Sequence, residues 1–148
     1  SEMNIPPYLI GASIIGVVAQ RLVRKVCLSC SSVKSLKKGK DDRAIKYGLN
    51  KARIINETNN EANSKLCPVC GGNGYKGRVG IYEVMKINEN LRECIMKEST
   101  ADVIRSNAFL VEGRSLLDYG MELVRKELTT IEEVERVCLL EESLPEEL

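Results

Sequence analysis

The sequence predicts an α+β protein, mostly helical, in which a small segment held by four cysteines precedes a C-terminal helical bundle. Two Cys-x-x-Cys pairs, at Cys27/Cys30 and Cys67/Cys70, bound the small segment. After residue 88, four stretches carry apolar side chains at steps of three and four, which is the spacing of amphipathic helices. Between the two, residues 78–87 partly alternate apolar and polar side chains, which indicates a strand.

The first expected element is a helix over residues 8–26, with Pro6 and Pro7 at its entry. Its apolar side chains occur nearly all round as far as Ala19, so the helix is expected to be buried on most sides. The apolar stretch 5–19 is too short for a typical membrane span. Positive charges follow this stretch instead of preceding it, unlike a signal peptide, so a cytosolic location is expected.

Residues 31–66 lack a sustained apolar period and are expected to form a long loop, with a short amphipathic helix within 44–55. They carry nine Lys or Arg against four Asp or Glu, whereas residues 98–148 carry five against thirteen. Two interpretations are open. Both surfaces are simply solvated, or the basic segment touches an anionic partner or an acidic domain of a larger assembly.

Three of the four C-terminal helices are expected to begin at a capping residue: Asn88, then Ser99 or Thr100, then Thr130 with Glu133 in a Thr-x-x-Glu box. The remaining helix is expected to follow Gly113. The last residues, 141–148, are expected to fray. The side chains expected to face inward are Leu91, Cys94, Ile95, Val103, Ile104, Ala108, Leu116, Leu117, Met121, Val124, Leu128, Ile131, Val134, Val137 and Cys138.

The four paired cysteines are the candidate metal ligands: Cys27, Cys30, Cys67 and Cys70. Two-residue spacing lets both thiolates of a turn point at one ion, and two such pairs complete a tetrahedral sulfur cage suited to structural zinc. Such a cage has no open position, so the metal would fold the segment and would not activate water. Unpaired or oxidised thiols and a thioredoxin-like redox pair are the alternatives. Cys94 and Cys138 are expected to be small apolar core residues.

Composition excludes several kinds of catalytic and binding site. The 148 residues are 43% hydrophobic and contain no His, so a His-dependent triad, an imidazole base and a His-containing metal site are absent from this chain. One Phe, five Tyr and no Trp leave few platforms for stacking nucleic-acid bases.

The glycines of residues 72–77 match G-x-G-x-x-G, but they follow a cysteine pair and precede a strand. A dinucleotide site needs the reverse order, with a strand before the glycines and a helix after them. A phosphate loop would need Lys and Ser or Thr where Arg78 and Val79 stand. Residues 67–74 also match the C-x-x-C-x-G-x-G unit of J-protein cysteine-rich domains, although the first pair lacks the glycines.

Four motifs in order carry a resemblance to a known family: "AQRLVR" at 19–24, the two cysteine pairs, "GRVGIYE" at 77–83 and "TIEEV" at 130–134. From about Met3 to Val137 the chain closely resembles the C-terminal third of the type II secretion and type IV pilus assembly ATPases, of the protein E type. The resemblance implies a cytoplasmic hexameric motor that hydrolyses ATP at the inner face of the bacterial cytoplasmic membrane and contacts neighbouring subunits and an inner-membrane platform protein.

The resemblance also implies a domain plan: residues 1–26 as the end of a RecA-like motor core, 27–77 as a tetracysteine zinc subdomain and 78–148 as a strand with a helical subdomain. Zinc would be structural, and ATP and magnesium would bind only in the longer parent protein. The family's phosphate loop, acidic boxes and histidine box lie upstream, so we expect this fragment not to hydrolyse ATP alone. Because the family's retraction motors usually lack the cysteine pairs, assembly or secretion is favoured.

Two arginines and one alternative function stay open. Arg78 could face an ATP-bearing neighbour in a hexamer, although a local cap or pairing is favoured. The same two roles are open for Arg21. The alternative function is an independent zinc module, of J-protein or zinc-ribbon type, that binds clients or nucleic acid. Its electrostatic support is the basic segment 31–66, and no nucleic-acid partner is expected on the main interpretation.

Overall fold

The computed structural model describes residues 5–36, 42–55, 67–110 and 113–139. The chain forms two compact units: unit 1 comprises residues 1–20 and 82–115, and unit 2 comprises residues 21–81 and 116–148. Each unit joins two separate stretches, so the units cut across the three consecutive segments expected from the sequence. The expected division concerns a longer protein and stays a prediction.

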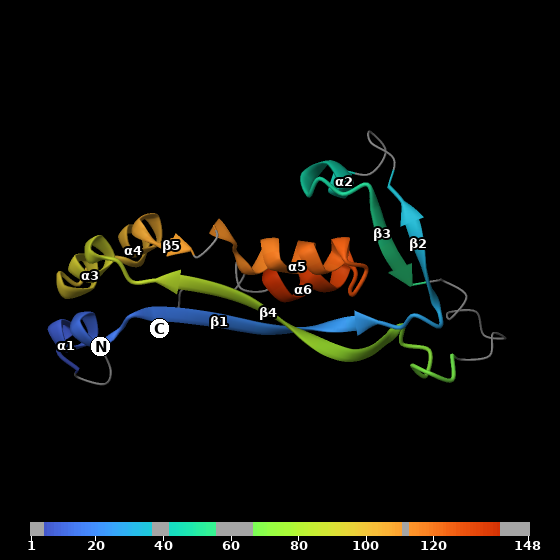
Figure 1. Cartoon of the computed structure of the whole chain (residues 1–148), viewed down its shortest axis with the longest axis horizontal. Coiled ribbons are helices and arrows are strands. Elements are labelled where there is room, and N and C mark those ends of the chain that lie inside the picture. Colours follow the sequence, from blue (N-terminus) through green and yellow to red (C-terminus); the bar gives the residue numbers. More distant parts are fainter. Residues whose placement is uncertain (1–4, 37–41, 56–66, 111–112, 140–148) are drawn as a thin grey trace. The chain divides into compact units, whose positions relative to one another are not determined.

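The helix expected over residues 8–26 is confirmed at its start, as far as Ser13, and is wrong for the rest of the stretch. Helix α1 covers only Pro7–Ser13, and strand β1 occupies Gly16–Val26 (Figure 1). The second half of this stretch is rich in β-branched valine, a residue that prefers the pleated backbone. Periodicity alone does not separate a continuous apolar strand from a buried helix, and here the strand is the outcome.

Strand β4, Tyr75–Lys86, confirms the strand expected over 78–87, beginning three residues earlier and ending one residue earlier. It pairs with β1 and with the short β5, Phe109–Leu110, in a three-stranded sheet of order β1-β4-β5. The β4–β5 ladder is antiparallel and aligns Met85 with Leu110. The chain contains both helices and two small sheets, so the predicted α+β class is confirmed.

Unit 1 contains α1, α3 and α4. Helix α3, Glu89–Met96, begins as expected: Leu91 N–H donates to the Asn88 side-chain oxygen over 2.9 Å, and Leu91 is fully buried. Helix α4, Ala101–Asn107, follows Thr100 and buries none of its residues. Val103 is 42% exposed, so its expected inward position is wrong, because this seven-residue helix has no buried face.

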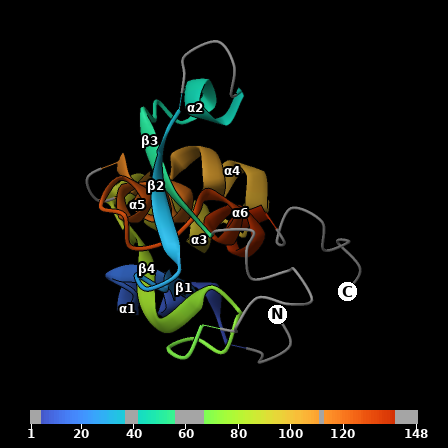
Figure 2. The same cartoon turned by 90° about the vertical axis from the view of Figure 1, so that its right-hand side faces the viewer.

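In unit 2, the stretch expected to be a loop contains an antiparallel strand pair. Strand β2, Ser31–Ser35, pairs with β3, Lys51–Ile55, and the short helix α2, Asp42–Lys46, lies between them in sequence (Figure 2). The helix expected within 44–55 is therefore wrong beyond Lys46. Residues 37–41, 56–66 and 140–148 lie outside the described residues, so the loop and fraying predictions there have no outcome.

Two helices complete unit 2, α5 over Leu116–Arg125 and α6 over Ile131–Leu139. They pack closely at Gly120, where a Cβ atom would lie 2.4 Å from a methyl carbon of Val134. Their apolar stripes bury Met121, Val124 and Ile131 as expected. This core also takes in Leu49 and Ala52, so the polar excursion between the cysteine pairs is packed on the helical pair.

The four helices expected to form one C-terminal bundle divide between the units, with α3 and α4 in unit 1 and α5 and α6 in unit 2. Cys94 and Cys138 are partly buried, and Cys138 packs against the apolar clusters of unit 2. The longest described helix has ten residues, and no described helix has the length and hydropathy of a membrane span.

Candidate metal centre

Unit 2 brings the four predicted ligands to one place. Cys27 directly follows β1, Cys30 directly precedes β2, and Cys67 and Cys70 lie on the turn that leads into β4. Their four Sγ atoms all lie within 4.8 Å of one another. Cys27, Cys67 and Cys70 are buried, and Cys30 packs against them from a partly exposed position.

The spacing of the sulfur atoms fits a shared ion better than a disulfide. The Sγ atoms of Cys27 and Cys67 are 4.0 Å apart, and those of Cys30 and Cys70 are 3.5 Å apart. A disulfide requires about 2.05 Å. Zinc–sulfur bonds of about 2.3 Å in a tetrahedral cage place neighbouring sulfurs about 3.8 Å apart. The donor set therefore fits structural zinc, which would be held by these four cysteines and would supply cross-linking and no open coordination position.

Backbone turns after each pair support this arrangement. Gly71 N–H donates to the Cys67 carbonyl over 2.8 Å, and Cys27 N–H donates to the Gly74 carbonyl over 2.8 Å. Gly74 has a φ of 76°, and a Cβ there would lie 2.6 Å from Ile55 side-chain atoms. Glycine is required at this position on both grounds, backbone conformation and space. The glycines thus shape a thiol-lined turn before a strand, not a nucleotide cradle.

The pKa of the Cys70 thiol is lowered from its ordinary value. Burial by itself raises its pKa, but backbone N–H groups of Gly74 and Gly72 and the neighbouring thiols of Cys30 and Cys67 outweigh burial and bring the pKa to about 7. A pKa near neutrality favours the thiolate, which is the form that binds a metal. The environment of the cluster is therefore suited to a cation.

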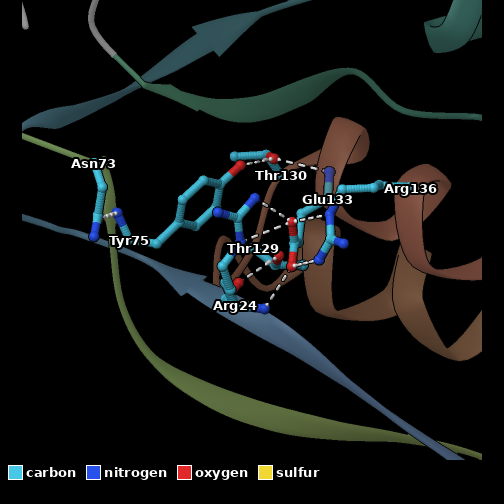
Figure 3. A network of polar contacts seen from close by, with 7 residues as sticks. All are labelled: Arg24, Asn73, Tyr75, Thr129, Thr130, Glu133 and Arg136. Atoms are coloured by element: carbon cyan, nitrogen blue, oxygen red, sulfur yellow. Dashed lines mark hydrogen bonds and ion pairs between the residues drawn. The ribbon is translucent and has the colours of Figure 1, made fainter.

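A second cluster, which the sequence does not predict as a site, surrounds one buried carboxylate on α6 (Figure 3). Its centre is Glu133, whose side chain is fully buried on α6. The Glu133 carboxylate accepts hydrogen bonds from Arg24 N–H, Nε–H and Nη2–H over 3.0, 3.0 and 2.6 Å. It also accepts bonds from Arg136 Nε–H and Nη2–H over 3.0 and 2.8 Å. We call these three residues the Glu133 network.

These contacts explain how a buried carboxylate is tolerated. Burial raises the pKa of Glu133, but the hydrogen bonds from Arg136 and Arg24 outweigh it and lower the pKa to about 2. The carboxylate raises the pKa of both arginines in turn. Glu133 therefore stays ionised, and its charge is matched inside the fold.

Threonines and a tyrosine connect the Glu133 network to the strands. Thr129 Oγ1 donates to the Arg24 carbonyl over 2.8 Å, and the hydroxyls of Thr130 and Tyr75 are 3.0 Å apart. The Arg24 guanidinium lies over the Tyr75 ring, 4.0 Å from its centre. Glu133 N–H donates to Thr130 Oγ1 over 3.3 Å, which confirms the predicted cap of α6. That box was the one sequence signal that pointed to Glu133.

The basic and acidic segments of the sequence pair with each other. Arg43 lies 2.7 Å from a Glu132 oxygen, and Glu127 accepts from Lys51 at 2.7 Å and from Arg53 at 3.1 Å. The Tyr47 hydroxyl adds a bond of 2.8 Å to Glu135. Neither sequence interpretation describes this pairing, because the basic side chains contact acidic side chains of α6 and of the α5–α6 turn in the same chain. Contact with an external anionic partner stays a prediction.

Arg78 is exposed and has no hydrogen bond or ion pair to any described residue, so the favoured local pairing is not found. It lines an open pocket of about 460 Å³ together with Leu22, Arg24, Asn73, Tyr75 and Gly77. Arg21 is also exposed, and it does make a polar or electrostatic interaction.

Comparison of the sequence with known proteins identifies its family. The family described as "Type II/IV secretion system protein" matches residues 1–136. The type II secretion system ATPase E of Vibrio cholerae is 33% identical over 136 residues, which are 92% of this chain and 25% of that protein. The type II secretion system protein E of Pseudomonas aeruginosa is 35% identical over 92% of this chain and 26% of its own length.

The type IV pilus assembly ATPase PilB of Thermus thermophilus is 34% identical over 90% of this chain and 14% of its own length. The chain thus spans about a quarter or less of the length of these curated relatives. Because the family match covers nearly all of the sequence, the chain belongs to the type II/IV secretion system protein family.

Proposed function

We propose that this chain is the C-terminal part of a cytoplasmic hexameric ATPase that powers type IV pilus assembly or type II secretion. Within it, Cys27, Cys30, Cys67 and Cys70 hold a structural zinc ion, and α5 and α6 form part of a helical interaction subdomain. The observation that carries the proposal is the meeting of four sulfurs within 4.8 Å in a chain that the family matches over residues 1–136. ATP and magnesium would bind to the longer protein only.

The exposed side chains of β1 support a place beside a larger motor core. This strand lies at one edge of the three-stranded sheet, and Val17, Val18 and Leu22 are 43%, 61% and 53% exposed. Apolar side chains on an unpaired strand edge are usually covered in the working protein. On this proposal the RecA-like core of the motor covers them, and the neighbouring subunits and the platform protein contact other faces.

The zinc part is tested by elemental analysis of the purified chain. One zinc per chain is expected, and Cys67→Ser should abolish the stoichiometric zinc, whereas Cys94→Ser should not. The enzyme part is tested by adding the chain to ATP and magnesium, where no hydrolysis is expected. A metal-free chain that keeps its fold and its stability in a chelator would reject the structural zinc site.

The alternative, an independent zinc module that binds unfolded clients or nucleic acid, is less well supported. The basic residues that would attract an anionic ligand include Arg43, Lys51 and Arg53, and all three are engaged by acidic side chains of the same chain. Titration with single-stranded DNA and with a denatured protein distinguishes the two functions. Saturable binding that survives added salt would favour the alternative.

A further inference from the structure

The turn between α5 and α6 is held against the end of β1, next to the first cysteine pair. Val26 N–H donates to the Leu128 carbonyl over 3.0 Å, and Thr129 Oγ1 donates to the Arg24 carbonyl over 2.8 Å. Glu133 accepts from the backbone N–H of Arg24 over 3.0 Å. The main chain of residues 24–26, immediately before Cys27, is therefore hydrogen-bonded to the turn and to α6.

The same turn holds the strand that leaves the second cysteine pair. Tyr75 begins β4, five residues after Cys70, and its hydroxyl lies 3.0 Å from that of Thr130. Its ring lies under Arg24, which Glu133 fixes from the other side. Directly between the two strands, Cys27 N–H donates to the Gly74 carbonyl over 2.8 Å. The chain segments next to both cysteine pairs thus contact the α5–α6 turn or Arg24, and Glu133 holds Arg24.

We propose that Glu133 is a positioning residue for the four-cysteine centre: by holding Arg24 it sets the separation of the two cysteine pairs, so that metal affinity and docking of the α5–α6 turn are linked. The proposal rests on the proposed metal-binding function. Linkage is reciprocal, because a group that strengthens metal binding must itself be held more firmly when the metal is bound. Glu133 touches no sulfur, so its effect on the metal is transmitted through Arg24 and the backbone of β1.

The test is a zinc titration of the whole chain against a competing chromogenic chelator, comparing Glu133→Gln with the wild type. Loss of a residue that hydrogen-bonds a metal ligand typically weakens metal binding about 10- to 100-fold. Glu133 acts one contact further away, so a loss near the lower end of this range, about tenfold, is expected here. Glu132→Gln is the matched control, because Glu132 is the adjacent carboxylate on α6 and is exposed. It should change the zinc dissociation constant by less than about twofold.

Two further variants cover the case in which Glu133→Gln fails to fold. Thr129→Val and Tyr75→Phe each remove one hydrogen bond of the turn, and each should weaken zinc binding on the order of threefold. Hydrogen exchange supplies a second measurement: zinc should slow exchange of the amides of Val26 and Glu133 in the wild type, and should slow them less in Thr129→Val.

The outcomes separate the two proposals. If the wild type binds zinc tightly and these variants bind it equally tightly, the positioning role of Glu133 is wrong and the structural zinc site stands. If zinc protects residues 27–30 and 67–74 from exchange but leaves Val26 and Glu133 unchanged, the linkage is again rejected. If the wild type does not bind zinc, both proposals fail.

Discussion

The four-cysteine cluster and the Glu133 network both join distant parts of unit 2, but they differ in where their stabilisation originates. The sulfur contacts connect residues 40 positions apart, and the Arg24–Glu133 contacts connect residues 109 positions apart. On the proposed function, the cysteines present four donors to a cation supplied from outside the chain. The Glu133 network contains its own opposite charges. On the proposed function, the first cluster needs a metal to complete it, whereas the second is complete in the folded chain without one.

The largest expected effect comes from removing the metal. Structural zinc contributes about 10–16 kcal/mol of apparent binding free energy in zinc-finger peptides, which rivals the whole stability of a small domain. A strong chelator should therefore expose the amides of residues 27–30 and 67–74 to rapid exchange. Amides of Val124 and Val134 should stay protected, because their apolar core contains none of the four cysteines. Hydrogen exchange with mass spectrometry measures both sets.

Cys138→Ser is the control for this experiment, since Cys138 lies outside the cluster and packs against apolar side chains. It should leave the response to chelator unchanged. Equal protection of all regions with and without chelator would show that the cysteine cluster is held by the fold alone, as the Glu133 network is.

Acid should separate the two clusters in order. The pKa of Glu133 is lowered from 4.5 to about 2 in the folded chain, so its ionised form stabilises the fold above about pH 4.5, and this contribution is lost as the pH falls towards 2. Thiolate ligands must be deprotonated, so zinc should leave at a higher pH. A pH series with a zinc indicator and far-ultraviolet circular dichroism should show zinc release first and loss of helix signal second. If zinc release and loss of the helix signal occurred at the same pH, the two clusters would not respond separately to acid.

The cysteine cluster could be predicted from the sequence because its signal is local. Each Cys-x-x-Cys pair is complete within four residues of sequence. A tetrahedral zinc site needs four ligands, so two such pairs predict one site however far apart they lie in the chain. The intervening residues do not enter this prediction, which is why the four cysteines are grouped correctly even though β2 and β3 are expected to be a loop.

The Glu133 network could not be predicted because its signal is not local. Arg24 was placed on a helix, where its side chain would follow a different face, and only the strand β1 directs it towards α6. The Thr-x-x-Glu box is correct for the Glu133 N–H, which donates to Thr130 Oγ1. The box would direct the Glu133 carboxylate to the Thr130 backbone N–H, whereas that carboxylate bonds Arg24 and Arg136. The pairing of Arg43 with Glu132 had a weak signal, the opposite charge of two segments, but no pattern specified which residues meet.

Substitution of Gly74, whose carbonyl accepts from Cys27 N–H, should have an effect of intermediate size on the stability of the cysteine cluster. Gly74→Ala should destabilise unit 2 by about 1–3 kcal/mol, because the new methyl group meets Ile55 and the φ of 76° is unfavourable for alanine. Chemical denaturation with saturating zinc measures it. Gly48→Ala is the matched control: its φ is also positive, at 61°, but no atom lies within 4 Å of the added carbon, so a smaller loss is expected. Equal losses would mean that space at Ile55 is unimportant.

The smallest effect tests the other half of the comparison, since α6 carries two adjacent carboxylates in opposite settings. Glu132 and its partner Arg43 are 56% and 43% exposed, whereas the Glu133 side chain is fully buried. Exposed pairs contribute about 0.2–1 kcal/mol and are screened by salt. A double-mutant cycle with Arg43→Ala and Glu132→Ala should give a coupling energy in that range, falling towards zero in 1 M salt. A salt-resistant coupling above about 2 kcal/mol would contradict the view that burial separates the two sites, because neighbouring carboxylates would then be equivalent despite their different exposure.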